Sequence, residues 1–236
     1  LRLEAVRDAL GPEGRIRVDV NGAWDLETAL TALPLMDQAA QGLEYAEQPC
    51  GSVEDLAALR RAVDVPIAAD ESIRLSADPL AVARLEAADV AILKAAPLGG
   101  TRRALGLAER LGLPAVVSSA LDTSVGMSAG VALAAALPEL HGACGLGTVR
   151  LLVRDVAVPS AVPVAGRLPV RPAHVSRSLL ASAMADDELT ARWQVRLGHL
   201  LGALRARRTR EAADPTTAVD SVTEQMVASR LRAVRR

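Results

Sequence analysis

Four side chains that could share one reaction are spaced regularly along the N-terminal half of the chain. Asp19, Glu47, Asp70 and Lys94 follow one another at intervals of about 25 residues, close to the length of one strand-helix unit. Lys94 is the only lysine among 27 basic residues. Arginine stays protonated under ordinary conditions, whereas a lysine amine can exchange a proton or present a compact cation to a developing anion. Lys94 is therefore a candidate catalytic residue.

The three carboxylates indicate a site for a divalent metal ion. Each falls at the C-terminal end of a predicted strand, and neighbouring parallel strands bring these ends to one mouth, so we expect the carboxylates to meet within a few ångströms. Anions this close repel one another unless a cation neutralises them. Oxygen ligands favour Mg²⁺ or Mn²⁺ over Zn²⁺. The predicted chemistry is removal of a proton next to a carboxylate, with the metal holding the enolate.

Each of these residues alone has an ordinary explanation. A single acid at a strand end is more often a helix cap than a ligand, and a single lysine is often a surface residue. All three acids share the same position on successive strands, however, and the lone lysine follows on the next strand. This shared spacing favours a functional site.

The elements that must position these residues alternate between short apolar runs and helical segments, as in a parallel α/β protein. A barrel and an open sheet both fit this alternation. Polar residues at successive strand ends favour a TIM-type barrel, since an open sheet would more naturally show a Gly-rich phosphate loop. Ser52 followed by Asp55, and Asp78-Pro79, predict helix starts. We predict strands over residues 16–19, 43–47, 67–70, 90–94, 115–118 and 143–146.

Composition excludes several classes of partner. The net charge of -1 gives no field that would attract nucleic acid, and no apolar run reaches the roughly 18 residues of a membrane helix. Cys50 and Cys144 form no CxxC pair, which argues against zinc and suits a reducing cytoplasm. We therefore expect a cytoplasmic protein that binds a small carboxylate, without nucleic acid or membrane partners. The sequence does not predict the oligomeric state.

Three regions follow from the sequence pattern. Residues 1–150 are predicted to form a partial barrel, with residues 1–10 as a helix leading to the Asp19 strand. Residues 151–204 begin with a Pro- and Val-rich extended segment and continue in a helical run from 179 to 204, which we expect to pack back toward a capping region. Residues 205–236 hold eight arginines and four acids, and are predicted to be a surface helix or a disordered tail.

Four segments in register resemble the muconate-lactonising subgroup of the enolase superfamily. They are residues 18–24 (VDVNGAW), 44–49 (EYAEQP), 69–72 (ADES) and 93–100 (LKAAPLGG). The resemblance implies a modified (β/α)7β TIM barrel with Mg²⁺ bound by Asp19, Glu47 and Asp70. It also implies that Lys94 faces the general base and stabilises the enolate, or exchanges protons in racemising relatives.

The resemblance extends to residues around the ligands. It implies that Asn21 and Glu71 lie beside the metal ligands. Residues 118–126 (SSALDTSVG) and 145–148 (GLGT) are most similar to the actinobacterial o-succinylbenzoate synthases of this subgroup. In such lyases the reaction is dehydration of 2-succinyl-6-hydroxy-2,4-cyclohexadiene-1-carboxylate to o-succinylbenzoate, a step toward menaquinone. The substrate contacts that the resemblance implies are Ser118, Ser119, Gly145 and Thr148.

One feature departs from the family pattern. Members of the subgroup carry a Lys-x-Lys motif on the strand before the first metal ligand. Another strand and an N-terminal capping domain precede this motif. Lys94 is the only lysine here, so this base is absent. We therefore expect a barrel that lacks the cap and the first strands, exposes apolar edges and has little or no activity alone.

Two other readings remain open. An N-acylamino-acid racemase or dipeptide epimerase of the same subgroup would share the metal site and Lys94. The substrate preference of such an enzyme would depend on the cap. Residues 118–126 favour the synthase over this racemase or epimerase. A reading of another class is a non-catalytic remnant that keeps the fold and the ligands without a base.

Overall fold

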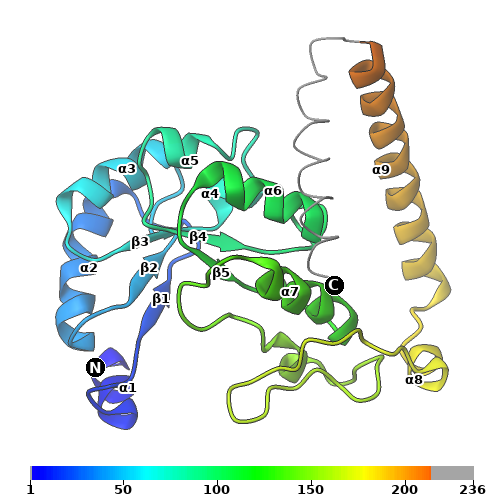
Figure 1. The fold of residues 1–236 in the computed structure, drawn as a ribbon, viewed down its shortest axis with the longest axis horizontal. Coiled ribbons are helices and arrows are strands. Elements are labelled where there is room, and N and C mark those ends of the chain that lie inside the picture. The colour runs from blue at the N-terminus through cyan, green and yellow to red at the C-terminus, as the bar shows by residue number, and fades with distance from the viewer. Residues whose placement is uncertain (1, 214–236) are drawn as a thin grey trace.

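Five short parallel strands form a single sheet in the order β1-β2-β3-β4-β5, so each strand pairs with its neighbour in the chain (Figure 1). The computed structural model describes residues 2–213. In chain order the elements are α1 (Arg2–Leu10), β1 (Arg17–Asp19), α2 (Leu26–Ala40), β2 (Tyr45–Glu47), α3 (Val53–Ala62), β3 (Ile67–Ala69), α4 (Glu71–Arg74), α5 (Ala81–Arg84), β4 (Val90–Leu93), α6 (Thr101–Leu111), β5 (Ala115–Val117), α7 (Ser124–Ala136), the 3-10 helix η1 (Thr148–Leu151), α8 (Arg177–Ser182) and α9 (Asp187–Ala213).

The two faces of the sheet have separate apolar clusters. Side chains alternate between the faces of a strand, so Ala91 and Leu93 join the helices in the larger cluster while Val90 and Ile92 lie opposite. Helices α2, α3, α6 and α7 supply buried residues to the larger cluster (Figure 1). Tyr45 belongs to the smaller cluster, together with Val90 and Ile92. This arrangement is a parallel half-barrel with helices outside, which confirms the predicted barrel-type α/β fold.

The sixth predicted strand is a correction to the sequence analysis. Residues 143–146 form only an isolated parallel bridge, between Ser118 and Gly145. On the segment's other side, the carbonyl of Ala143 accepts a hydrogen bond from the Arg17 guanidinium at 2.7 Å. Arg17 also lies over the ring of Tyr45, 4.6 Å from its centroid. The segment is thus held by one bridge to β5 and by Arg17, and it is not a strand.

The helix-start predictions had different outcomes. Ser52 caps α3 as predicted, since its hydroxyl accepts the Asp55 backbone N–H at 3.0 Å. Asp78-Pro79 does not begin a helix. Pro79 lies in a turn, and α5 starts at Ala81, whose N–H donates to the Asp78 carbonyl. The turn delays the helix beyond the proline.

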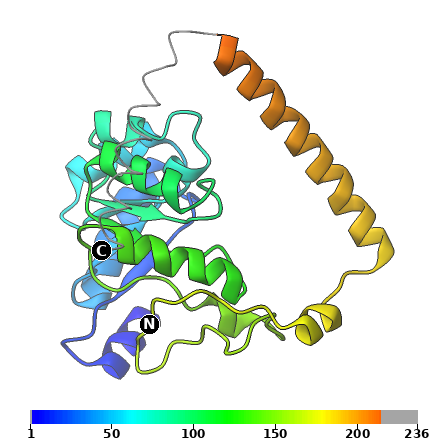
Figure 2. The same ribbon diagram turned by 45° about the vertical axis from the view of Figure 1, so that its right-hand side comes forward.

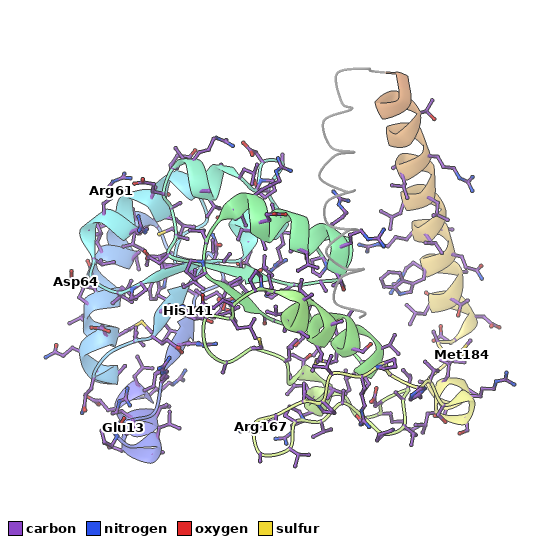
Figure 3. The ribbon with its side chains drawn as sticks, viewed as in Figure 1. Glu13, Arg61, Asp64, His141, Arg167 and Met184 are labelled. Carbon is purple, nitrogen blue, oxygen red and sulfur yellow. The ribbon has the colours of Figure 1, made fainter. Side chains whose placement is uncertain are left out.

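The C-terminal region differs from the predicted single helical run. The run divides into α8 and α9, because Asp186 accepts the N–H of Leu189 on its side chain and of Thr190 on its carbonyl, which starts a new helix. From residue 185 to residue 206 the side chains are almost all exposed, and α9 stands apart from the sheet (Figures 2 and 3). The part of the Arg-rich tail up to Ala213 is helical, and the remainder lies outside the described residues. None of the described helices could cross a membrane.

A half-buried carboxylate links the extended segment to the start of α7. Asp155 accepts hydrogen bonds from the hydroxyls of Ser124 and Ser160, and from the N–H groups of Ser124 and Val156 at 3.0 and 2.8 Å. Burial by itself would raise the pKa of Asp155, but these hydrogen bonds outweigh it and lower the pKa. The folded chain therefore favours the ionised form of Asp155.

Replacing Asp155 by asparagine is expected to lower the free energy of unfolding at pH 7 by about 1.5 kcal/mol, since charge-assisted bonds are lost. A lowered folded-state pKa stabilises the protein above the ordinary aspartate pKa, and the effect disappears as the pH falls through the folded value. The difference between the two proteins should therefore shrink below about pH 4. Urea unfolding at several pH values measures it, with the exposed Asp64→Asn as the control. An unchanged difference at pH 3 would contradict the prediction.

Candidate metal and active site

Lys94 and Asp70, which follow strands β4 and β3, form a close ion pair. Lys94 Nζ lies 2.5 Å from Asp70 Oδ2, and the two side chains are 14% and 1% exposed. Parallel pairing of the two strands brings their C-terminal ends together, as the spacing in the sequence predicts. The lone lysine therefore lies at the same strand ends as the candidate metal ligands.

A second cation, Arg74, holds the other side of this site. Its Nε lies 3.0 Å from Asp70 Oδ1, and one of its terminal nitrogens lies 2.6 Å from Glu71 Oε1. The remaining oxygen, Glu71 Oε2, is buried and accepts no hydrogen bond from a described residue. The sequence analysis missed Arg74, although its position one helical turn after Asp70 is a signal for such a pair. Glu71 and Asp70 thus share Arg74, and the implied place of Glu71 beside a metal ligand stays a prediction.

Glu47 and Asp19 are register partners on neighbouring strands. Burial, followed by repulsion from Asp19 and Asp70, raises the pKa of Glu47 to about 7, although Lys94 opposes the shift. Asp19 is exposed, and its Oδ1 accepts the backbone N–H of Asn21 at 2.9 Å. Negative charge therefore accumulates at this edge of the sheet. Asn21 contacts Asp19 through its backbone N–H.

The predicted meeting of three carboxylates within a few ångströms is not seen. Among residues 2–213, no three His, Cys, Asp or Glu side chains are grouped closely enough to hold a metal ion. Asp70 is turned toward Lys94 and Arg74, and Asp19 toward the N–H of Asn21. The protein's own cations and amides satisfy these carboxylates, so the assignment of Asp19, Glu47 and Asp70 as ligands stays a prediction.

Two of the predicted substrate contacts, Ser118 and Ser119, lie on the loop after β5, and the other two, Gly145 and Thr148, lie on the segment after α7. Ser118 donates its N–H to the carbonyl of Leu93, directly before the candidate lysine. Ser119 donates both its N–H and its hydroxyl to the carbonyl of Gly145, at 3.0 and 2.9 Å, and accepts the Thr148 hydroxyl at 2.9 Å. These bonds hold the loop in place. A role of the four residues in substrate binding stays a prediction.

The chain has clear relatives among known proteins. Residues 1–174, which include all four candidate residues, match the family model described as Enolase C-terminal domain-like. The o-succinylbenzoate synthase of Thermobifida fusca is 61% identical over 196 residues, and that of Mycolicibacterium smegmatis is 53% identical over 194. These matches cover 83% and 82% of this chain but 60% and 59% of the relatives, so the chain spans about three fifths of their length.

Solved structures give the same assignment. Muconate cycloisomerase from Pseudomonas fluorescens superimposes with a TM-score of 0.68 at 30% identity, covering 76% of this chain and 52% of that protein. N-succinyl Arg/Lys racemase from Bacillus cereus superimposes with a TM-score of 0.69 at 27% identity, covering 78% and 52%. Sequence and fold therefore agree, and the chain belongs to the enolase C-terminal domain-like family.

Proposed function

We propose that this chain is the barrel portion of an o-succinylbenzoate synthase, the cytoplasmic lyase that dehydrates 2-succinyl-6-hydroxy-2,4-cyclohexadiene-1-carboxylate on the way to menaquinone. The observation that carries the proposal is 61% identity to the synthase of Thermobifida fusca, over 83% of the chain. The ion pair of Lys94 and Asp70 supports it, because this pair places a compact cation at the predicted metal site.

The donor atoms at the strand ends suit a divalent cation in their chemistry, although the three carboxylates do not meet as a group among residues 2–213. These atoms are all carboxylate oxygens, which suit Mg²⁺ or Mn²⁺. Glu71 Oε2 is buried without a hydrogen bond, and the raised pKa of Glu47 reflects neighbouring negative charge that a cation would offset. Asp19, Glu47 and Asp70 would hold the ion. When bound, Mg²⁺ would stabilise the negative charge that develops on a substrate carboxylate after loss of the α-proton.

Lys94 supplies a second positive charge at this site. Asp70 holds its ammonium group close to the strand ends, and the side chain is only 14% exposed. In a site that excludes water, such a charge stabilises a developing anion more strongly than in bulk solvent. The substrate is thus expected to lie with its carboxylate facing Lys94. Residues 118–119, at the end of the neighbouring strand β5, would contact the substrate and restrict where it can lie.

A racemase or epimerase of the same family is the second candidate. The fold matches an N-succinyl Arg/Lys racemase at 27% identity, and that family member acts on a different substrate. Both candidates require a lysine on each side of the substrate, and this chain contains one. A non-catalytic remnant would keep the ion pair without turning over either substrate.

A chimaera separates these candidates. The part of the Thermobifida fusca synthase that precedes its match would be joined to residues 1–236, and the purified protein assayed with Mg²⁺. We expect dehydration within about tenfold of the parent synthase and slower racemisation of N-succinyl amino acids. Lys94→Arg should reduce turnover by about 100-fold or more, because the larger guanidinium cannot take the place of the compact ammonium group.

A control variant and two possible outcomes of the chimaera assay distinguish the three candidate functions. Arg61→Lys, an exposed change on α3, should leave turnover unaltered. Faster racemisation than dehydration would favour the second candidate. A folded chimaera that turns over neither substrate would identify the chain as a remnant and refute the proposal.

A further inference from the structure

We infer that Gln48 is a positioning residue that connects the strand ends carrying all three candidate metal ligands. This inference rests on the proposed metal site. Gln48 directly follows Glu47 at the end of β2, and it is 0% exposed. Every polar atom of its side chain and backbone is hydrogen-bonded. A buried amide with all its hydrogen bonds made holds the segments that it contacts in one arrangement.

The backbone of Gln48 leaves the sheet and turns toward β1. Its φ of 39° is in the left-handed region, which is uncommon for a residue other than glycine. Its N–H makes the last ladder bond to β3, to the Ala68 carbonyl at 2.8 Å, and its carbonyl accepts the N–H of Gly22 at 2.7 Å. Gly22 lies in the turn that follows Asp19. The backbone therefore fixes the β1 loop against β2.

The side chain of Gln48 serves β3 in place of this carbonyl. In a regular parallel ladder, the next N–H of β3 would donate to a backbone carbonyl of β2. Here Gly22 uses that carbonyl, and Gln48 Oε1 accepts the N–H groups of Asp70 and Ser72 instead, at 2.9 and 3.1 Å. Gln48 Nε2 donates to the Cys50 carbonyl at 2.9 Å and to Ser72 Oγ at 2.7 Å.

One buried residue thus links the loop of Asp19, the strand end of Glu47 and the backbone of Asp70. Carboxylates that face one another repel, and only a rigid frame keeps them close enough to share an ion. Glutamine suits this position because it both accepts and donates without adding charge. Asparagine tolerates the left-handed backbone equally well but is one methylene shorter. The extra methylene of glutamine is therefore what allows its amide to reach the backbone N–H of Asp70.

Metal affinity of the 236-residue chain tests the inference. Binding of Mn²⁺ would be followed by electron paramagnetic resonance and binding of Mg²⁺ by calorimetry. We expect Gln48→Met to weaken binding at least about tenfold, as loss of a partner that orients ligands usually does. Gln48→Asn retains the amide and the backbone conformation, and should weaken binding in the same direction. It keeps the test decisive if the methionine variant does not fold.

Two control variants separate positioning from stability. Leu33→Ala removes a fully buried side chain from α2, so it should lower the unfolding temperature while leaving Mn²⁺ affinity within about twofold. Ser72→Ala removes one partner of Nε2 but keeps both bonds to Oε1, and should change affinity by less than about threefold.

The possible failures point to different conclusions. Equal Mn²⁺ affinity of the unaltered chain and the Gln48→Asn variant would overturn the positioning role and leave the metal site intact. Weakening by Leu33→Ala as large as that by Gln48→Asn would also overturn it, because affinity would then follow stability alone. Absence of Mn²⁺ binding by the folded, unaltered chain would overturn the metal site, and the role of Gln48 with it.

Discussion

Replacing Asp70 by asparagine is expected to weaken Mg²⁺ binding by more than about 100-fold. Loss of an outer partner of a metal ligand already costs about 10 to 100-fold, and Asp70 is predicted to be a ligand itself. The substitution also leaves Lys94 without its carboxylate, and breaking a buried ion pair on one side costs about 3 kcal/mol. Calorimetry with Mg²⁺ and urea unfolding of the metal-free chain measure the two effects.

Asp89→Asn is the matched control for Asp70→Asn. Asp89 also pairs with an arginine, at 2.8 Å from Arg60 Nε, but it precedes β4 and so lies at the opposite end of the strands. The control should lower stability and leave Mg²⁺ affinity unchanged. Mg²⁺ binding by Asp70→Asn that matches binding by the unaltered chain would show that Asp70 is no ligand.

The 236-residue chain alone is expected to dehydrate the proposed substrate at least about 1,000-fold more slowly than the chimaera. A positioned general base contributes about 10² to 10⁴-fold, and the resemblance implies that this base is a second lysine. The only lysine in the chain is engaged with Asp70. Loss of absorbance of the cyclohexadiene substrate measures the rate.

The comparison requires that both proteins bind metal. Mn²⁺ affinity of the chain should lie within about tenfold of that of the chimaera, since the chain holds all predicted ligands. The rate difference then reports the missing base. Turnover by the chain alone at a rate near that of the chimaera would refute the requirement for a second lysine.

The strand positions and the neighbourhood of Lys94 could be predicted because they follow from local pattern. An apolar run of four residues ending in lysine gives β4, and parallel pairing then places Lys94 beside Asp70. The predicted strands over 67–70, 90–94 and 115–118 each include one polar residue beyond the end of β3, β4 and β5. Those over 16–19 and 43–47 begin one and two residues before β1 and β2. Asp70 begins α4 instead of ending β3.

The contacts that complete the site could not be predicted in the same way. Gln48 is connected to Asp70 through a side-chain amide, and nothing in the order of residues indicates whether such an amide faces solvent or a neighbouring strand. The missing sixth strand has a similar cause. Residues 143–146 pair with β5 through a single bridge, and the order of residues does not indicate how far such a pairing extends.

The sequential strand order has a consequence for how the site forms during folding. Each of the five strands pairs with its chain neighbour, and Asp19, Glu47, Asp70 and Lys94 come from four consecutive strand ends. Contacts between segments close in the chain form faster than those that must first close long loops. During synthesis the N-terminal part of a chain emerges first. The edge that carries the predicted metal ligands can therefore assemble while the segments that supply Ser118 and Thr148 are still being made.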